Sequence, residues 1–172
     1  MKKDLAIIAG LFLVIAILLV FGQGFTSVSF LSGGLQIGQS TPSGSTVGSR
    51  VNVTVKGLTV DAEVAANSAS RKKGLSKRDS IPFKQGMLFV FENPGQYGIW
   101  MKDMRFAIDI LWLDENKKVV DLIAEVVPEQ GKKDSELTIY KPSHNAKYVL
   151  EINAGLVKLN NIQVGDQAFF NL

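Results

Sequence analysis

The amino-acid sequence predicts a mainly β protein: a compact β-sandwich or barrel-like domain with one or two short helices, preceded by a single transmembrane helix. Apolar and polar residues alternate over residues 51–55, which is typical of a strand with one buried face. Residues 87–91 are apolar at every position, which indicates a strand covered on both faces. Many short segments of this kind, with few helical patterns between them, favour a sandwich or a barrel.

The remaining elements are expected in the following order. After a second strand at 58–66, a short helix should begin with Ser68 as its N-cap and end near residue 77. Further strands are expected at 97–102, 107–113, 118–127, 147–153 and 167–171, with a hairpin turn at 114–117 and one or two helical turns at 155–161. Residues 128–146 are polar and contain two prolines, so they hold either a short strand at 137–140 or a functional loop.

The N-terminal segment is predicted to cross a membrane. Residues 5–21 are predominantly apolar and carry no charge. As a helix they span roughly 26 Å, close to the ~30 Å hydrocarbon core of a bilayer. A cleaved signal peptide would have a shorter apolar core and small residues at its cleavage site, for which the best match is the weak Gly22-Gln23-Gly24. We therefore expect a retained anchor over residues 1–25, which contacts the membrane through residues 5–21.

The segment after the anchor is predicted to be a tether. Residues 26–49 are uncharged and rich in Gly and Ser, and the β domain is expected over residues 50–172. Lys2 and Lys3 precede the anchor, whereas its other flank carries no charge before Arg50. By the positive-inside rule, this asymmetry predicts a single-pass protein with a cytoplasmic N-terminus and an extracellular or periplasmic C-terminal domain.

The composition argues against several kinds of site. The chain has no cysteine, so it has no disulfide, no thiolate nucleophile and no Cys-based metal site. Its one histidine, His144, directly follows Ser143, which does not suit a Ser–His dyad. No metal ion or other cofactor is therefore predicted. The net charge of +3 is too small to indicate a nucleic-acid partner, and the basic residues lack interleaved aromatic side chains.

The first candidate site is a basic segment that contains two arginines. Arg71, Leu75 and Arg78 have the i, i+4, i+7 spacing that places both guanidinium groups on one face of a helix. Because arginine presents a planar fork that matches carboxylate or phosphate, this face is a candidate anion site. The alternative is a solvated basic face in which one arginine binds a buried carbonyl or acid.

The second candidate site comprises Trp100, Lys102 and Asp109. In a strand, Trp100 and Lys102 point to the same side because side chains alternate. Asp109 shares its face with Leu111 and Leu113, which is an apolar setting for an acid. A buried carboxylate needs a partner, and Lys102 is the expected one. Such a pair would be either a structural ion pair or a proton-transfer site.

These motifs occur together, and in this order, in a known family. They are R-x-x-G-L-x-x-R from Arg71, GMLFVF from Gly86, Trp100-Met101-Lys102, Ile108-Asp109-Ile110, Val119-Val120-Asp121, YVLEINAG from Tyr148, and Gly165-Asp166. The combination covers about residues 58–171 and resembles the DUF192 (UPF0127) family of uncharacterised small prokaryotic proteins. The chain departs from that family after Lys102. There the family commonly has Asn-Thr and then Pro-Leu-Asp, whereas this chain has Asp103-Met104 and then Ala107-Ile108 before Asp109.

The resemblance implies a compact, mainly β fold of sandwich or barrel type that is often exported or membrane-tethered. It implies no established activity and no cofactor. It also adds weight to the candidate ligand-binding residues, because the match includes polar positions as well as core positions. These residues are Arg71, Arg78, Trp100, Lys102 and Asp109.

The sequence therefore favours a non-enzymatic binding or accessory module outside the cytoplasm, whose partner is a small anionic or carbohydrate ligand or an envelope protein. The site is expected to be a cleft where Arg71 and Arg78 meet the strand that carries Trp100 and Lys102. One alternative is a hydrolase of cell-envelope polymers that uses the carboxylates of Asp109 or Glu151. Another is a structural or assembly domain, which would expose an apolar patch large enough for a partner.

Overall fold

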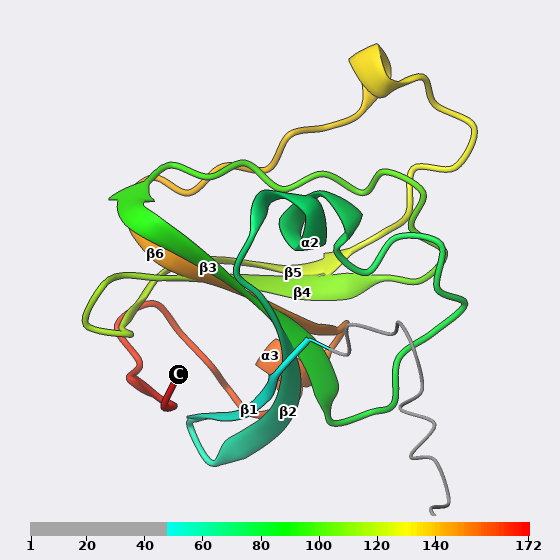
Figure 1. The fold of residues 1–172 in the computed structure, drawn as a ribbon. Coiled ribbons are helices and arrows are strands. Elements are labelled where there is room, and N and C mark those ends of the chain that lie inside the picture. Colours follow the sequence, from blue (N-terminus) through cyan, green and yellow to red (C-terminus); the bar gives the residue numbers. More distant parts are fainter. Residues whose placement is uncertain (1–47) are drawn as a thin grey trace, which may run out of the picture. The chain divides into compact units, whose positions relative to one another are not determined.

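A computed structural model of the chain describes residues 48–172, and these residues form a mainly β domain (Figure 1). Its elements are β1 (Arg50–Val55), β2 (Leu58–Ala65), α2 (Ser68–Lys73), β3 (Gln85–Gly95), β4 (Ile108–Leu113), β5 (Val119–Val126), the 3₁₀ helix η1 (Asp134–Glu136), β6 (Ala146–Asn153), α3 (Leu156–Leu159) and β7 (Ala168–Phe169). The predicted anchor at 1–25 and almost all of the predicted tether lie outside the described residues. Within residues 48–172, no helix has both the length and the apolar character needed to span a bilayer.

The seven strands form one curled sheet, a half-barrel, in the order β5-β4-β6-β3-β2-β1-β7. The predicted sandwich or barrel is thus a single strongly curved layer. Strands β2 and β3 are parallel, so their connection needs a crossover, which contains α2. Strands β1 and β2 form a hairpin whose turn residues, Lys56 and Gly57, have φ values of 50° and 82°. Positive φ at both positions matches the right-handed twist of the strands that the turn joins.

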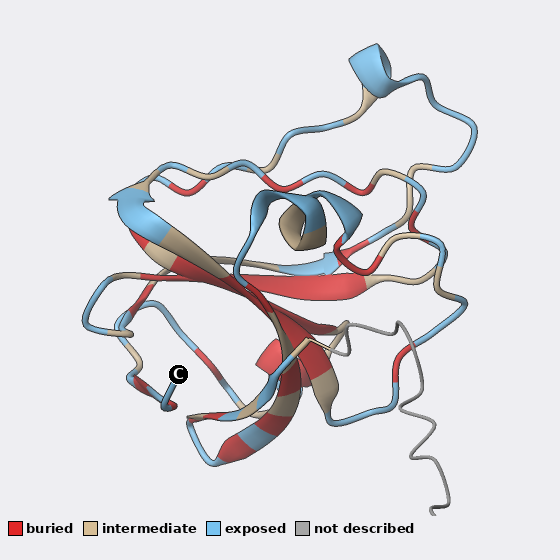
Figure 2. Cartoon of the chain, viewed as in Figure 1, coloured by how far each residue is buried: buried red, intermediate tan, exposed pale blue. Residues whose placement is uncertain are grey.

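Both faces of the sheet are covered by apolar side chains. We call the two faces the α3 face and the α2 face, after the helix that lies on each. Leu88 of β3 packs on the α3 face together with Leu156 of α3. Met87 and Phe89, its neighbours on β3, pack on the α2 face. The prediction that residues 87–91 form a strand covered on both faces is therefore confirmed. Figure 2 shows the same continuous burial along β4, where all six residues are buried.

The predicted helix at 68–77 is shorter than expected. The N-cap is Asn67, whose side chain accepts a hydrogen bond from the backbone N–H of Ser70, and the helix ends at Lys73. Gly74 follows with φ 50° and Lys77 has φ 63°, so the chain turns twice before Arg78. The prediction that Arg71 and Arg78 share one helical face is consequently wrong.

The strand predicted at 97–102 is also absent from the sheet. This segment has one isolated antiparallel bridge, between Ile99 and Tyr140 of the 128–146 segment. The register of β3 against β6 shifts between Val90 and Gly95, and the chain leaves the sheet after Gly95. The segment instead covers the α2 face, where Ile99 and Met101 are buried.

Candidate functional site

A cleft of about 860 Å³ opens between α2 with its following turn, the segment 97–104 and the α2 face of the sheet. Its walls carry four aromatic side chains, those of Phe89, Phe91, Tyr97 and Trp100. The rings of Phe91 and Tyr97 stack with their centroids 3.5 Å apart, whereas the Trp100 side chain remains 42% exposed. The cleft thus combines one exposed indole with aromatic rings that are buried or half-buried in its walls, and aromatic side chains commonly line small-molecule sites.

Arg71 projects from α2 into this cleft. Its Nη1 donates hydrogen bonds to the carbonyl oxygens of Ala66 (2.7 Å) and Val90 (2.9 Å), and its guanidinium lies 4.9 Å from the centroid of the Phe91 ring. These contacts fix the side chain against the sheet without neutralising its charge. Arg71 therefore binds two backbone carbonyls and also contributes positive charge to the cleft, while its role in binding an anion stays a prediction.

Trp100 and Lys102 lie together on the opposite wall. The Lys102 Nζ is 5.7 Å from the centroid of the Trp100 ring, within the range of a cation–π contact. Lys102 also forms an ion pair with Asp134 of η1, which ties the 128–146 segment to this wall. The predicted proximity of Trp100 and Lys102 is confirmed, although a turn and not a strand produces it.

The floor of the cleft contains an acid, Glu151 of β6. This side chain is 5% exposed and lies in register with Met87 of β3 and Ile110 of β4, both of which are buried. Burial among such apolar neighbours raises the pKa of Glu151 to about 8, because a desolvated carboxylate loses the hydration that stabilises its charge.

Positive charge exceeds negative charge along the cleft. The cations are Arg71, Lys72, Lys73, Lys77 and Lys102, and the acids are Asp103, Asp134 and Glu151. Nζ of Lys77 lies 3.9 Å from Oδ2 of Asp103, and Lys102 forms an ion pair with Asp134. Within the described residues, Arg71, Lys72 and Lys73 have no carboxylate within ion-pair distance. The α2 side of the cleft is consequently the side best suited to an anion.

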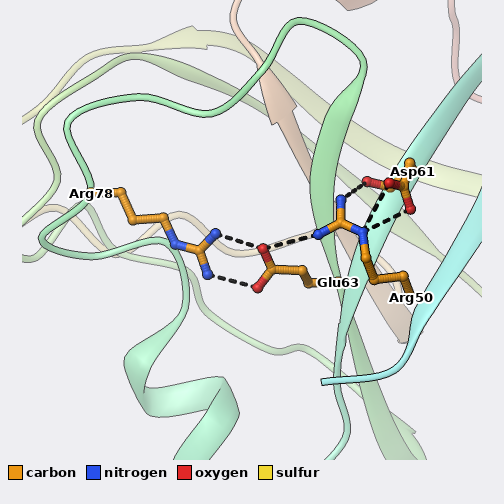
Figure 3. A network of polar contacts seen from close by, with 4 residues as sticks. All are labelled: Arg50, Asp61, Glu63 and Arg78. Atoms are coloured by element: carbon orange, nitrogen blue, oxygen red, sulfur yellow. Dashed lines mark hydrogen bonds and ion pairs between the residues drawn. The ribbon is translucent and has the colours of Figure 1, made fainter. Parts of the chain in front are cut away.

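Arg78 lies outside this cleft. Both of its terminal nitrogens donate to Glu63 on β2, at 2.7 Å each, and Arg50 reaches the same carboxylate at 3.2 Å (Figure 3). The hydrogen bonds from Arg78 hold the pKa of Glu63 below its ordinary value. Arg50 also binds Asp61, so the network joins β1, β2 and the turn after α2. The Arg78 side chain is thus engaged in a structural ion pair and is not brought to Arg71.

Asp109 is also placed elsewhere, on the α3 face. Its carboxylate accepts hydrogen bonds from the backbone N–H groups of Glu125 (2.7 Å), Gly155 (3.1 Å) and Val157 (2.7 Å). These bonds join the irregular part of β5 to the start of α3. The predicted pairing of Asp109 with Lys102 is wrong, because the two side chains lie on opposite faces of the sheet.

The strand register also separates Asp109 from Glu151. Glu151 is paired with Ile110, whereas Asp109 is paired with Ile152, and neighbouring residues on a strand point to opposite faces. The two carboxylates named for a hydrolase therefore do not converge on one site.

Ser143, His144 and Asp121 lie close together, but not as a catalytic triad. The Ser143 hydroxyl donates to Asp121 at 2.7 Å and lies 3.3 Å from Nδ1 of His144. In a triad the acid orients the histidine and the histidine takes the serine proton. Here the acid binds the serine directly, so the contact stabilises the turn before β6. Residues 48–172 contain no group of three or more acidic or histidine side chains arranged to hold a metal ion.

Three of the five predicted site residues thus meet in one cleft: Arg71, Trp100 and Lys102. Glu151 belongs to the same cleft but was predicted only as an alternative catalytic acid. Its signal in the sequence is a lone glutamate within the apolar run from Tyr148 to Ile152.

The β domain is similar in sequence to proteins of the UPF0127 group. The DUF192 family model, described as "Uncharacterized ACR, COG1430", matches residues 51–170. A UPF0127 protein of Pyrococcus furiosus is 29% identical over 127 residues, which cover 70% of this chain and 97% of that protein. A UPF0127 protein of Thermococcus gammatolerans is 29% identical over 104 residues, which cover 60% of this chain and 62% of that protein.

Two solved structures share the fold. One, from Sinorhizobium meliloti 1021, is named a "putative transcription regulator" and is 26% identical with a TM-score of 0.66, covering 74% of this chain and 98% of that one. The other, a protein of unknown function from Novosphingobium aromaticivorans, is 29% identical with a TM-score of 0.62, covering 70% and 83%. Because the family model spans nearly all of the β domain, the chain belongs to the DUF192 (UPF0127) family.

Proposed function

We propose that this protein is a non-enzymatic binding module, whose cleft beneath α2 takes a small ligand with an anionic group and a sugar-like ring. One observation carries the proposal: an exposed indole, that of Trp100, shares an open cleft with Arg71, Lys72 and Lys73, which have no carboxylate within ion-pair distance among residues 48–172. The cations attract the anionic group, and the aromatic wall offers a flat apolar surface to the face of a ring.

The arrangement of the cations supports an anionic ligand in particular. Arg71 is held in place by two backbone carbonyls, so little side-chain entropy is lost when its remaining N–H groups bind a ligand. Lys72 and Lys73 follow it on α2, and Lys102 lines the other wall, where it is paired with Asp134. An anion bound on the α2 side would therefore meet the positive charge of Arg71, Lys72 and Lys73.

Hydrolysis of a polymer is less well supported. A glycosidase needs two carboxyl groups ~5–10 Å apart with one of them free to act as a base or nucleophile. Glu151 shares its cleft with Asp103 and Asp134, and each of these is within ion-pair distance of a lysine. The cleft therefore has one uncommitted carboxyl, which suits binding better than acid–base catalysis.

The location of the module is part of the proposal. The charge-free segment at residues 5–21 is predicted to anchor the protein, with the β domain outside the cytoplasm. The ligand would then be a component of the cell envelope or a solute close to the outer membrane surface. Carbonate extraction of membranes from cells that make the full chain should leave the protein in the membrane fraction, whereas extraction into the soluble fraction would contradict the anchor.

Binding is tested by calorimetric titration of the full-length protein in mild detergent with glucuronate, glucose 6-phosphate and neutral glucose. We expect the two anions to bind and glucose to bind at least tenfold more weakly. Trp100→Ala and Lys102→Met should each weaken binding of the anions about tenfold or more. The matched controls are Phe83→Ala and Lys84→Met, which remove an aromatic ring that is 60% exposed and a lysine outside the cleft. Absence of binding, or equal losses in the controls, would contradict the proposal.

A further inference from the structure

The carboxyl of Glu151 is buried in the cleft floor without a partner among the residues that the structure describes. Each of the acids Glu63, Asp109, Asp121 and Asp134 accepts a hydrogen bond from the chain. The Glu151 carboxyl has no hydrogen-bond donor within reach among residues 48–172, and burial is the cause that raises its pKa. Its oxygens are nevertheless not sealed from the cleft, since no fully enclosed polar atom of the described chain lacks a partner.

A buried carboxyl without a hydrogen-bond partner destabilises the folded protein, so folding by itself does not explain its presence. A polar group that leaves water without a hydrogen-bond partner costs free energy, and an apolar residue at the same position would avoid that cost. The two strands beside Glu151 provide Met87 and Ile110, whose side chains are apolar. Among residues 48–172 these neighbours offer the carboxyl no partner, and the cleft that it lines is where a ligand can supply one.

We infer that Glu151 is a ligand-binding residue, whose carboxyl forms a hydrogen bond with an oxygen atom of the molecule bound in the cleft. This inference rests on the proposed function and deepens it, since it adds a contact at the floor to the cations and the indole at the walls. At neutral pH the carboxyl is largely protonated, because burial raises the pKa of Glu151 to about 8. It then donates to a hydroxyl or anionic oxygen of the ligand, as a neutral carboxylic acid can.

The class of ligand follows from this protonation state. An acid that donates a hydrogen bond favours an oxygen-rich ligand, such as a sugar acid or sugar phosphate. A ligand with a permanent positive charge, such as a quaternary ammonium, would instead need the ionised carboxylate, so its binding would strengthen as the pH rises. The two classes are therefore separated by the direction in which affinity changes with pH.

Other titratable groups face the same space and must be considered in a pH titration. The helix α2 and the turn after it contribute Arg71, Lys72, Lys73 and Lys77. The segment 97–104 contributes Tyr97, Lys102 and Asp103, and η1 contributes Asp134, while the parts of β3 and β4 that line the cleft are apolar. A variant that lacks only the Glu151 carboxyl keeps all of these groups. A change in affinity near pH 8 is consequently assigned to Glu151 by comparison with a variant that lacks its carboxyl.

The test is a calorimetric titration of the full-length protein with glucuronate and, separately, choline between pH 6 and 9. For the wild type we expect glucuronate affinity to be constant up to pH 7 and to fall above pH 8, by up to about tenfold per pH unit. Glu151→Gln, which keeps a donor that does not titrate, should bind at every pH about as the wild type does at pH 6. Glu151→Leu, which keeps the fold but has no donor, should bind about tenfold to a hundredfold more weakly at pH 6.

A second readout does not depend on affinity. With ¹³C-labelled glutamate, the carboxyl resonance of Glu151 is assigned by its absence from the Glu151→Gln spectrum. Its pKa should rise further when glucuronate is present, because the ligand binds the protonated form. Equal affinity and an equal pH profile in wild type and Glu151→Leu would overturn this inference while leaving the proposed function intact. Tighter binding of choline as the pH rises would overturn the donor role. Failure of the wild type to bind any probe would overturn the proposed function together with the inference.

Discussion

Replacing Glu151 by glutamine should stabilise the protein at alkaline pH and flatten the dependence of its stability on pH. Glutamine has nearly the shape of the protonated acid, so Glu151→Gln preserves the packing against Met87 and Ile110. It differs in one respect that matters, since it cannot lose a proton and become charged inside the protein. The variant therefore isolates the cost of ionising one buried carboxyl.

The magnitude follows from the pKa. Burial raises the pKa of Glu151 from 4.5 to about 8. Between these values the folded protein holds a proton that the unfolded chain has released, so the wild type loses stability as the pH rises. The favourable contribution is complete below about pH 4.5 and is lost by about pH 8. At 1.36 kcal/mol per pH unit, the loss is at most about 5 kcal/mol, a large part of a typical domain's stability.

The assay is urea unfolding of both full-length proteins in the same detergent at each pH from 5 to 9, followed by the fluorescence of Trp112, which is fully buried. The free energy of unfolding of Glu151→Gln should exceed that of the wild type increasingly up to about pH 8 and by a constant amount above it. Glu63 and Asp166, whose pKa values lie below their ordinary values, are present in both proteins and cancel in the difference. Parallel stability curves would show that Glu151 is not desolvated and would refute the reasoning.

Three further predictions concern the scaffold around the cleft. Asp109→Ala leaves three backbone N–H groups without their acceptor, so the free energy of unfolding should fall by at least about 3 kcal/mol in urea titrations; a loss below 1 kcal/mol would contradict this role. Arg78→Met removes a half-buried ion pair with Glu63 and should cost about 1 kcal/mol. Calorimetry should detect no change in the affinity of the Arg78→Met variant for glucuronate, and a tenfold loss would show that Arg78 contributes to the ligand site. Gly86→Ala places a Cβ atom 2.4 Å from the backbone oxygen of Glu151, so circular dichroism should show a strongly destabilised or unfolded protein; a melting temperature like that of the wild type would contradict the tight β3–β6 contact.

Much of the sheet is predictable from the sequence because local pattern and tertiary environment agree there. The alternation at 51–55 and the apolar run at 87–91 correspond to β1 and β3, and the structure covers them on the sides that the pattern indicates. The order and pairing of the strands, in contrast, cannot be read from the local sequence pattern. Nothing in the pattern distinguishes two packed sheets from one curled sheet, because both bury the same residues.

The errors arise where the chain departs from regular structure. Gly74 and Lys77 adopt positive φ and end the helix that the spacing of Arg71 and Arg78 suggested. Lysine is an uncommon residue for that conformation, so the sequence gives little warning of the second turn. The segment 97–102 has the residues of a strand, but within residues 48–172 its one strand-like partner is Tyr140, which is distant in the sequence.

The candidate site could be predicted only in part, for the same reason. Arg71, Trp100 and Lys102 were found because their residue types suit a ligand and the chain brings them to one cleft. The partners of Asp109 are backbone groups of Gly155 and Val157, which have no signature in the sequence. Glu151 is conspicuous only once the register shows that it faces the cleft and Asp109 does not.

The most direct test of the central claim, that the cleft beneath α2 is a ligand-binding site, is a nuclear magnetic resonance titration of the ¹⁵N-labelled full-length protein with glucuronate. We predict that the indole N–H signal of Trp100 and the backbone signals of Arg71 and Lys102 move together and saturate. The signals of Lys56 and Gly57, in the β1–β2 hairpin and outside the cleft, should not move. Shifts confined to other surfaces, or no saturable shift at Trp100, would contradict the account.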